Sequence, residues 1–334
     1  AGANEDLNAT GDLDITGATT IIGAGSGSTI IDANGIDRVF ELLGGPVVLQ
    51  SLTVTNGAVA PGYAGGNLLQ RQYADLTVAD SVVSNGSATY GGGISADRGV
   101  TTIIRSEIIN NTVTEFPGAG GDGSAISKSG AANATLIVTG SLIAGNNAVQ
   151  ASAAVFVGSN STITNSTITG NTSRTYTVLI EASSNTTISV SLSHVTIANN
   201  TTSGGASGSG LTLNFIEPTT STLTVEGSLI QNNLRMGAVS NCHVAASGAI
   251  TSGGHNLSDD ATCTSFTQPG DLNNNQSTTL GALADNGGPT RTLALVAGSS
   301  AIDAAGACGG VTLTDQRSVS RPQGPACDIG AFEV

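Results

Sequence analysis

The chain has 334 residues, and its 10 Lys and Arg stand against 24 Asp and Glu, which gives a formal net charge of −14. Phosphate backbones and anionic lipid surfaces are bound through clustered cations, so this charge argues against nucleic acid and membrane surfaces as partners. No stretch of 18 apolar residues occurs, and no membrane span is predicted.

The first predicted strands lie close to the N-terminus. Residues 12–16 read Asp-Leu-Asp-Ile-Thr and residues 20–22 read Thr-Ile-Ile, which is typical of short β-strands. No amphipathic helix covers them, so this first rung is expected to present an exposed sheet edge. We therefore predict that Asp12, Leu13, Asp14 and Ile15 take part in an end-to-end contact with a second copy.

A six-residue pattern then recurs seven times between residues 52 and 233. Its central apolar positions are spaced by 25 to 35 residues, at Val54, Val83, Ile108, Ile143, Ile168, Ile197 and Ile230. A constant core with variable spacing indicates one structural turn per repeat, with the extra residues placed in loops. Each unit ends in Asn or Gly, which tolerate a left-handed backbone at a corner. Stacked Asn side chains can also hydrogen-bond to one another.

A second short element lies between these units. Small residues precede an aliphatic one at Gly93-Ile94, Ala125-Ile126, Ala154-Val155 and Gly210-Leu211. A single coil of this kind cannot bury its apolar face, so the coils must stack. We predict an all-β fold, a right-handed parallel β-helix of about ten coils, some of them near the C-terminus. Residues 1–240 are expected to form parallel β-helix coils, and residues 241–334 a β-helix end or capping module.

The four cysteines fall in the C-terminal third as two local pairs, Cys242 with Cys263 and Cys308 with Cys327. Four cysteines allow three connectivities, and the two short loops favour pairing of neighbours. Each disulfide is expected to contribute about 3 kcal/mol by restricting the unfolded chain. Disulfides form in oxidising compartments, so we expect an extracellular or cell-surface protein whose signal sequence has been removed.

The C-terminal third contains several motifs in a fixed order. They are Gly254-His255-Asn256-Leu257, Asp285-Asn286-Gly287-Gly288-Pro289-Thr290, Thr314-Asp315-Gln316-Arg317, Arg321-Pro322-Gln323-Gly324 and Cys327-Asp328-Ile329-Gly330-Ala331-Phe332-Glu333. In this series the chain resembles the closing module of the "choice-of-anchor Q" bacterial surface proteins. Its repeats resemble those of polymorphic outer-membrane-type proteins. The resemblance implies export and surface association, and it brings no catalytic residues.

An enzyme that acts on polysaccharides, either a lyase or a hydrolase, is the alternative on this fold. A lyase needs a base and a cation beside the uronate, and a hydrolase needs grouped carboxylates. The cations are scattered, at Arg71, Arg98, Arg105, Lys128 and Arg174. Asp12 and Asp14 share a strand face, but no similar set follows on the next rungs. No catalytic, cofactor-binding or zinc-binding residue is predicted, and His194 is expected at a surface corner.

The chain contains one incomplete calcium-binding motif. Asp271, Asn273 and Asn275 have the spacing that begins a Ca²⁺ loop, but Gln276 and Ala282 stand where such loops need Gly and Glu. A polar turn is therefore favoured at this place.

The sequence as a whole predicts a non-enzymatic extracellular structural or cell-surface protein. We expect self-association end to end into a fibre or surface layer, with Ile329 and Phe332 on the C-terminal side of the contact. An adhesin that binds glycans is the second alternative to the enzyme.

Overall fold

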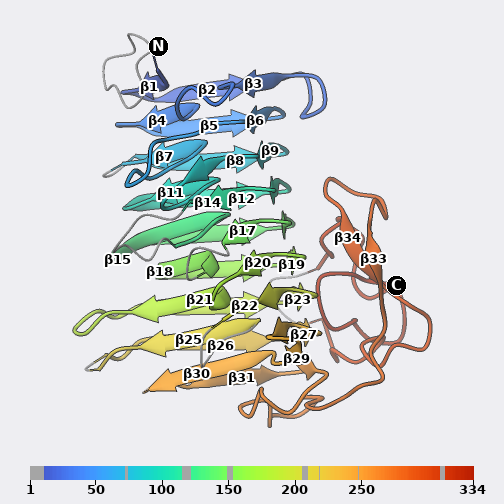
Figure 1. Cartoon of the computed structure of the whole chain (residues 1–334). Coiled ribbons are helices and arrows are strands. Elements are labelled where there is room, and N and C mark those ends of the chain that lie inside the picture. The colour runs from blue at the N-terminus through green and yellow to red at the C-terminus, as the bar shows by residue number, and fades with distance from the viewer. Residues whose placement is uncertain are drawn as a thin grey trace.

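The computed structural model describes residues 11–71, 74–114, 122–148, 153–204, 210–217, 219–246, 248–308 and 313–334. In these ranges the chain forms strands and turns, and no helix occurs. Figure 1 shows the strands wound into a stack of coils, with β1, β2 and β3 at one end of the stack. The architecture is thus the predicted parallel β-helix, or β-solenoid.

Each coil begins with one strand in each of two half-sheets, A1 and A2, which together make one sheet. Half-sheet A1 contains β1 (Leu13–Ile15), β4 (Phe40–Leu42), β7 (Leu68–Gln70), β11 (Ile94–Ala96), β21 (Tyr176–Ala182), β25 (Leu211–Phe215) and β30 (Cys242–Ala246). Half-sheet A2 contains β2 (Thr19–Ile22), β5 (Pro46–Gln50), β8 (Asp75–Ala79), β12 (Gly99–Ile104), β22 (Ser189–Ser193), β26 (Thr222–Glu226) and β31 (Ile250–Gly254). Two long strands, β15 (Ile126–Thr139) and β18 (Ala153–Thr164), run through both half-sheets.

Two further sheets complete the coils. Sheet B contains β3 (Ile30–Asp32), β6 (Thr53–Thr55), β9 (Val82–Ser84), β13 (Glu107–Ile109), β16 (Leu142–Ala144), β19 (Thr167–Thr169), β23 (Thr196–Ala198), β27 (Leu229–Gln231) and β32 (Leu257–Ser258). Sheet C contains β10 (Ser87–Ala88), β14 (Thr112–Val113), β17 (Asn147–Ala148), β20 (Thr172–Ser173), β24 (Thr201–Thr202), β28 (Leu234–Arg235) and β29 (Ala238–Val239). Sheet B has nine strands, so the chain completes about eight turns.

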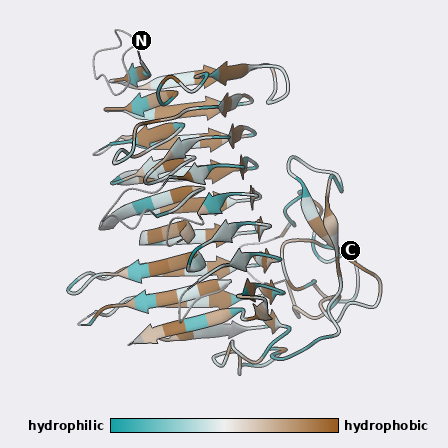
Figure 2. Ribbon diagram, viewed as in Figure 1, coloured by the Kyte–Doolittle hydropathy of each residue, from teal (hydrophilic) through white to brown (hydrophobic). Residues whose placement is uncertain are grey.

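The predicted repeat forms the centre of the core. Val54, Val83, Ile108, Ile143, Ile168, Ile197 and Ile230 are paired in register along sheet B, and each is at most 1% exposed. Hydrophobic residues recur at corresponding places in successive coils (Figure 2). Stacking therefore buries the apolar face that one coil leaves open.

Two rows of left-handed residues turn the chain at the corners. The row between half-sheet A2 and sheet B has φ values of 44° to 60°, at Ser51, Asp80, Arg105, Gly140, Asn165, His194 and Gly227. The row after sheet B has φ values of 49° to 66°, at Asn56, Asn85, Asn110, Gly145, Gly170, Asn199 and Asn232. The second row is the corner expected from the Asn and Gly endings, and that prediction is confirmed.

A ladder of buried asparagines follows the second corner. The Nδ2 of each residue donates to the Oδ1 of the next over 2.8 to 3.1 Å, through Asn67, Asn111, Asn146, Asn171, Asn200, Asn233 and Asn241. At the far end the Nδ2 of Asn241 donates to the carboxylate of Asp259. The ladder confirms that stacked corner asparagines bond along the stack, and it satisfies polar groups that would otherwise be buried without partners.

After β32 the chain crosses the end of the stack and then leaves it, so the number of turns, about eight, is lower than the ten expected. Residues 276–308 and 313–334, here called the lateral module, lie beside the coils (Figure 1) and contain the antiparallel pair β33 (Leu280–Ala284) and β34 (Thr292–Leu295). Arg291 of this module pairs with Glu107 on β13, and the N–H of Gly330 donates to the carbonyl of Gly227 beside β27. The lateral module thus bridges several coils along their side.

Lys128, the chain's one lysine, lies inside the solenoid. It is 0% exposed, and its Nζ donates to the carbonyls of Arg98 and Gly99 over 3.0 Å each. Burial lowers the pKa of this ammonium to about 8, although the carboxylates of Asp97 and Asp75 oppose the shift. Lys128 therefore holds the turn of the preceding coil from within.

This lowered pKa predicts a stability that rises with pH between about 8 and 10.5. In that window the unfolded chain retains the proton of Lys128 while the folded chain releases it, and the full effect is roughly 3 kcal/mol. Chemical denaturation at several pH values should show this rise in the parent chain. In Lys128→Met the rise should be smaller by that amount, and equal pH profiles would contradict the assignment.

Candidate functional site

The N-terminal coil carries the residues predicted to form an end-to-end contact. Leu13 is 54% exposed, whereas Ile15 is 8% exposed and belongs to the main core. Three more apolar side chains of this coil and its turns are exposed, namely Ile22, Ile30 and Ile36. Leu13, Ile36 and neighbouring residues line a hollow of about 200 Å³ at this end. Large apolar side chains are therefore gathered at the start of the stack.

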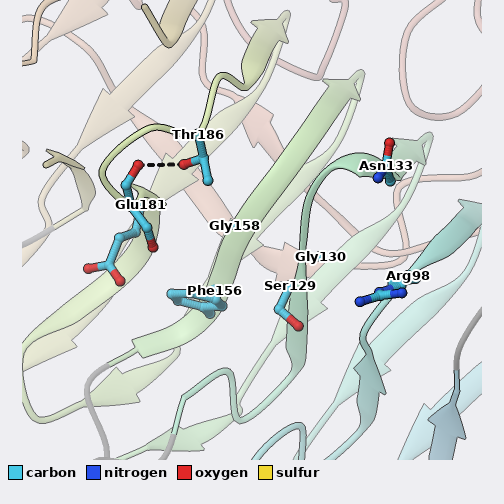
Figure 3. A pocket seen from close by; sticks show the side chains of 9 residues that line it. Arg98, Ser129, Gly130, Asn133, Phe156, Gly158, Glu181 and Thr186 are labelled. Carbon is cyan, nitrogen blue, oxygen red and sulfur yellow. Dashed lines mark hydrogen bonds between the residues drawn. The ribbon is translucent and has the colours of Figure 1, made fainter. Parts of the chain in front are cut away.

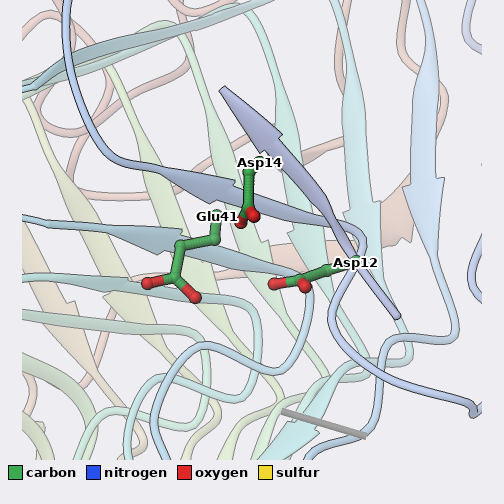
Figure 4. A group of neighbouring side chains, drawn as sticks. All are labelled: Asp12, Asp14 and Glu41. Carbon is green, nitrogen blue, oxygen red and sulfur yellow. The ribbon is translucent and has the colours of Figure 1, made fainter. Parts of the chain in front are cut away.

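Asp12 and Asp14 lie in a cluster with Glu41, and the carboxylates converge (Figure 4). One oxygen from each lies within 4.8 Å of the others. Arg38 occupies the same place: its Nη1 contacts Asp12 at 2.7 Å and Glu41 at 2.6 Å, and Arg71 also pairs with Glu41. Burial raises the pKa of Asp12, while the hydrogen bond from Arg38 lowers it. The cluster is an ion-pair network that fastens β1 to β4.

The C-terminal motifs form a second charged network inside the lateral module. The side chains of Arg321 and Glu333 are both 0% exposed and pair at 2.9 Å. Arg321 also donates to the carbonyls of Asp328 and Gly330, and Glu333 accepts the N–H groups of Gln323 and Asp328. The conspicuous polar residues of these motifs thus hold the module together.

Ile329 and Phe332 take part in this interior. They are 0% and 8% exposed, in a small core shared with Leu229 and Leu257 of sheet B. Arg317 stacks on the ring of Phe332, with 3.6 Å from its guanidinium carbon to the ring centroid. The structure therefore places both residues where the lateral module packs against the side of the last coils.

The two predicted disulfides are present. Cys242 pairs with Cys263 and Cys308 with Cys327, with Cα–Cα distances of 4.8 and 5.6 Å. The first draws residues 259–275 beneath the last coil, where Cys263 and Phe266 are buried in the main core. The second lies within the lateral module. Such disulfides are characteristic of an oxidising environment.

The turn suggested for calcium is occupied by protein hydrogen bonds. The Oδ1 of Asp271 accepts the N–H of Asn256, and its Oδ2 accepts the hydroxyl of Ser252 and the N–H of Gln268. Asn273 accepts the next backbone N–H, and Asn275 accepts from Ser277 and Ser300. These bonds explain the Asp-x-Asn-x-Asn spacing as a turn that closes the last coil, and the calcium site stays a prediction.

His194 occupies a corner, as predicted, but the expectation that it lies on the surface is wrong. It is 7% exposed, and its ring faces Gly227, where an added Cβ would approach to 2.9 Å. Burial, with help from Arg321 and His255, lowers its pKa to about 3. The lateral module covers this corner, which the local sequence around His194 does not indicate.

A groove lies where half-sheets A1 and A2 meet on β18. Here β18 passes directly between the half-sheets, through Gly158. In the coil before it, β15 carries extra residues between Lys128 and Thr135, and in the coil after it residues 183–188 form a loop. The two longer connections lie on either side of the short one, and the groove between them has a volume of about 480 Å³. The groove therefore results from a difference in connection length between adjacent coils.

The groove is lined by residues of four successive coils (Figure 3). Arg98 lies at one end and Glu181 at the other, with the ring of Phe156 between them. Ser129, Asn133 and Thr186 add hydroxyl and amide groups. The Nδ2 of Asn214 donates to Glu181 over 2.7 Å, which fixes that carboxylate. The arrangement offers one cation, one aromatic face and several neutral polar groups.

Comparison with known proteins adds no assignment. No protein family, curated protein or solved structure matches the chain. Across the described parts of the chain, no helix is long and apolar enough to cross a membrane.

Glu181 is the one carboxylate among the groove's lining residues. Asp122 is a neighbouring acid: burial and the charge of Glu181 raise its pKa to about 7. Asp122 is not part of the groove lining, so the lining lacks the facing carboxylate pair that glycoside hydrolysis uses. The sequence singled out Arg98 only as a scattered cation. Phe156 and Glu181 were missed because their proximity depends on how the coils align.

Proposed function

We propose that this protein is a non-enzymatic extracellular scaffold that joins a second copy through its N-terminal coil. The observation that carries the proposal is the gathering of exposed apolar side chains there, with Leu13 at 54%, Ile22 at 67% and Ile30 at 59% exposure. Strands β1, β2 and β3 are also the outermost strands of their stacks in the described structure. Open edges and apolar patches of this kind are typical of association sites.

The opposite end of the stack differs. Residues 259–275 cross it and hydrogen-bond to the last coil, with Phe266 buried beneath. A contact between unlike ends would meet this covered surface, so the geometry favours joining two N-terminal ends. A two-fold axis would pair the edge strands antiparallel, and such a contact closes as a dimer. This arrangement replaces the expected fibre with a rod of twice the length.

The extracellular setting rests on two supports. The paired cysteines need an oxidising compartment to form. The C-terminal motifs resemble those of "choice-of-anchor Q" bacterial surface proteins, in which they imply export. We propose accordingly that the scaffold acts at a bacterial cell surface.

The assembly state tests the proposal. The chain is expected to sediment as a dimer at micromolar concentration, and the pair Leu13→Glu with Ile30→Glu should raise the dimer dissociation constant at least about 100-fold through buried like charges. Leu313→Glu is the matched control, because Leu313 is 68% exposed but lies in the lateral module. A parent chain that stays monomeric, or a dimer insensitive to the paired variant, would overturn the proposal.

A further inference from the structure

The groove on β18 has the shape of a site for an elongated ligand. Arg98 and Glu181 belong to coils that are three steps apart, which is on the order of 14 Å along the stack. Gly158 lines the groove between these two residues without a side chain. A side chain at Gly158 would fill this part of the groove, since an added Cβ would lie 3.2 Å from the ring of Phe156. An extended chain with small units fits this form.

The lining chemistry favours a hydroxyl-rich ligand. Phe156 is half-buried and faces the groove, and an aromatic face of this kind packs on the C–H face of a sugar ring. Ser129 and Asn133 can both donate and accept hydrogen bonds, as the hydroxyls of a sugar require. The hydroxyl of Thr186 donates to the carbonyl of Ser183 and adds an acceptor. The carboxylate of Glu181, held by Asn214, can accept hydrogen bonds from sugar hydroxyls at one end of the groove. Lipids would need a more apolar lining.

Arg98 adds a requirement for negative charge. Its guanidinium is exposed at the groove's end, and planar carboxylates are the groups that Arg binds in a bidentate manner. The backbone that carries Arg98 is held by the buried Nζ of Lys128 and the Nε2 of Gln70, which both bind the carbonyl of Arg98. This double support fixes the backbone from which the Arg98 side chain extends into the groove.

We propose that this groove binds an acidic oligosaccharide, with a sugar carboxylate at Arg98, a sugar ring on Phe156 and hydroxyls at Glu181. A nucleic acid strand would present a phosphate at every nucleotide to a protein of net charge −14, with one cation in the groove. A segment with a single acidic sugar matches the single cation. The site is independent of the N-terminal contact, and its failure would leave that contact untouched.

A glycan array tests the proposal, if it carries uronic-acid and sialylated oligosaccharides beside their neutral counterparts. The parent chain is expected to bind acidic members, and the best of them should then be titrated by calorimetry. Phe156→Ala and Arg98→Ala should each weaken this binding about tenfold or more, because each removes one main contact. The Arg98 variant should also lose the dependence of affinity on salt.

Arg174→Ala is the matched control, since Arg174 is also exposed but lies beyond β20, away from the groove. Its affinity should equal that of the parent chain, and circular dichroism should show that all three variants fold. Binding of no acidic glycan, equal binding of neutral counterparts, or affinities unchanged in both groove variants would overturn the proposal.

Discussion

Replacing Asn171 with alanine is expected to lower the free energy of unfolding by about 4 kcal/mol, at the upper end of single substitutions. Asn171 is 1% exposed, and its side chain makes four hydrogen bonds. Its Oδ1 accepts from the backbone and side chain of Asn146, and its Nδ2 donates to Ile143 and Asn200. Alanine leaves these buried partners unsatisfied, at a cost of about 1 to 3 kcal/mol each.

Hydrogen exchange and chemical denaturation measure this effect. Because neighbouring coils stabilise one another in a solenoid, the loss of protection should centre on β16, β19 and β23. Asn160→Ala is the control, since Asn160 lies on the same coil at the outer face, where a substitution should cost below about 1 kcal/mol. Equal losses for the two variants would show that the ladder contributes little beyond ordinary turn geometry.

Replacing Arg321 with methionine is expected to cost about 3 to 5 kcal/mol and to release the lateral module from the coils. The substitution leaves the carboxylate of Glu333 buried without its cation, and it removes the bonds to the carbonyls of Asp328 and Gly330. Limited proteolysis should then cut within residues 276–334 while the coils stay protected. The double variant Arg321→Met with Glu333→Gln should recover part of the loss, because the unpaired charge is gone.

An exposed ion pair at the same interface provides the control. Arg291 and Glu107 also join the module to the coils, but the Arg291 side chain is 41% exposed. Exposed pairs contribute at most about 1 kcal/mol, so Arg291→Met should leave the module docked. If Arg291→Met releases the module as readily as Arg321→Met does, burial of the Arg321 pair is not what holds it.

The sequence predicted the coils well because the residues of the repeat contact their counterparts in the neighbouring coils. The row from Val54 to Ile230 and the asparagine corners repeat in every coil, so each copy supports the same interpretation. The disulfide pairs were also predicted, since each closes a short loop. To predict these features it is enough to know that each turn of the chain stacks on the one before it.

The groove and the docking of the lateral module depend on relations that no single coil contains. Phe156 becomes a groove residue only because the connections before and after β18 are longer than its own. Ile329, Phe332 and His194 are buried because residues far apart in sequence pack together. In the sequence Lys128 resembles a surface cation. Its burial follows from the strand register, which aligns it with the buried residues Ala96 and Val157.

The lateral module has a mechanical consequence. Hydrogen bonds between coils run along the axis of the stack, so a pull on the two ends strains each coil-to-coil interface in series. Between Glu107 and Gly227 the module forms a parallel strut that shares this load. The coils before β13 have no such brace in the described structure. Under tension the rod should therefore yield first near its N-terminal end and keep its braced half intact.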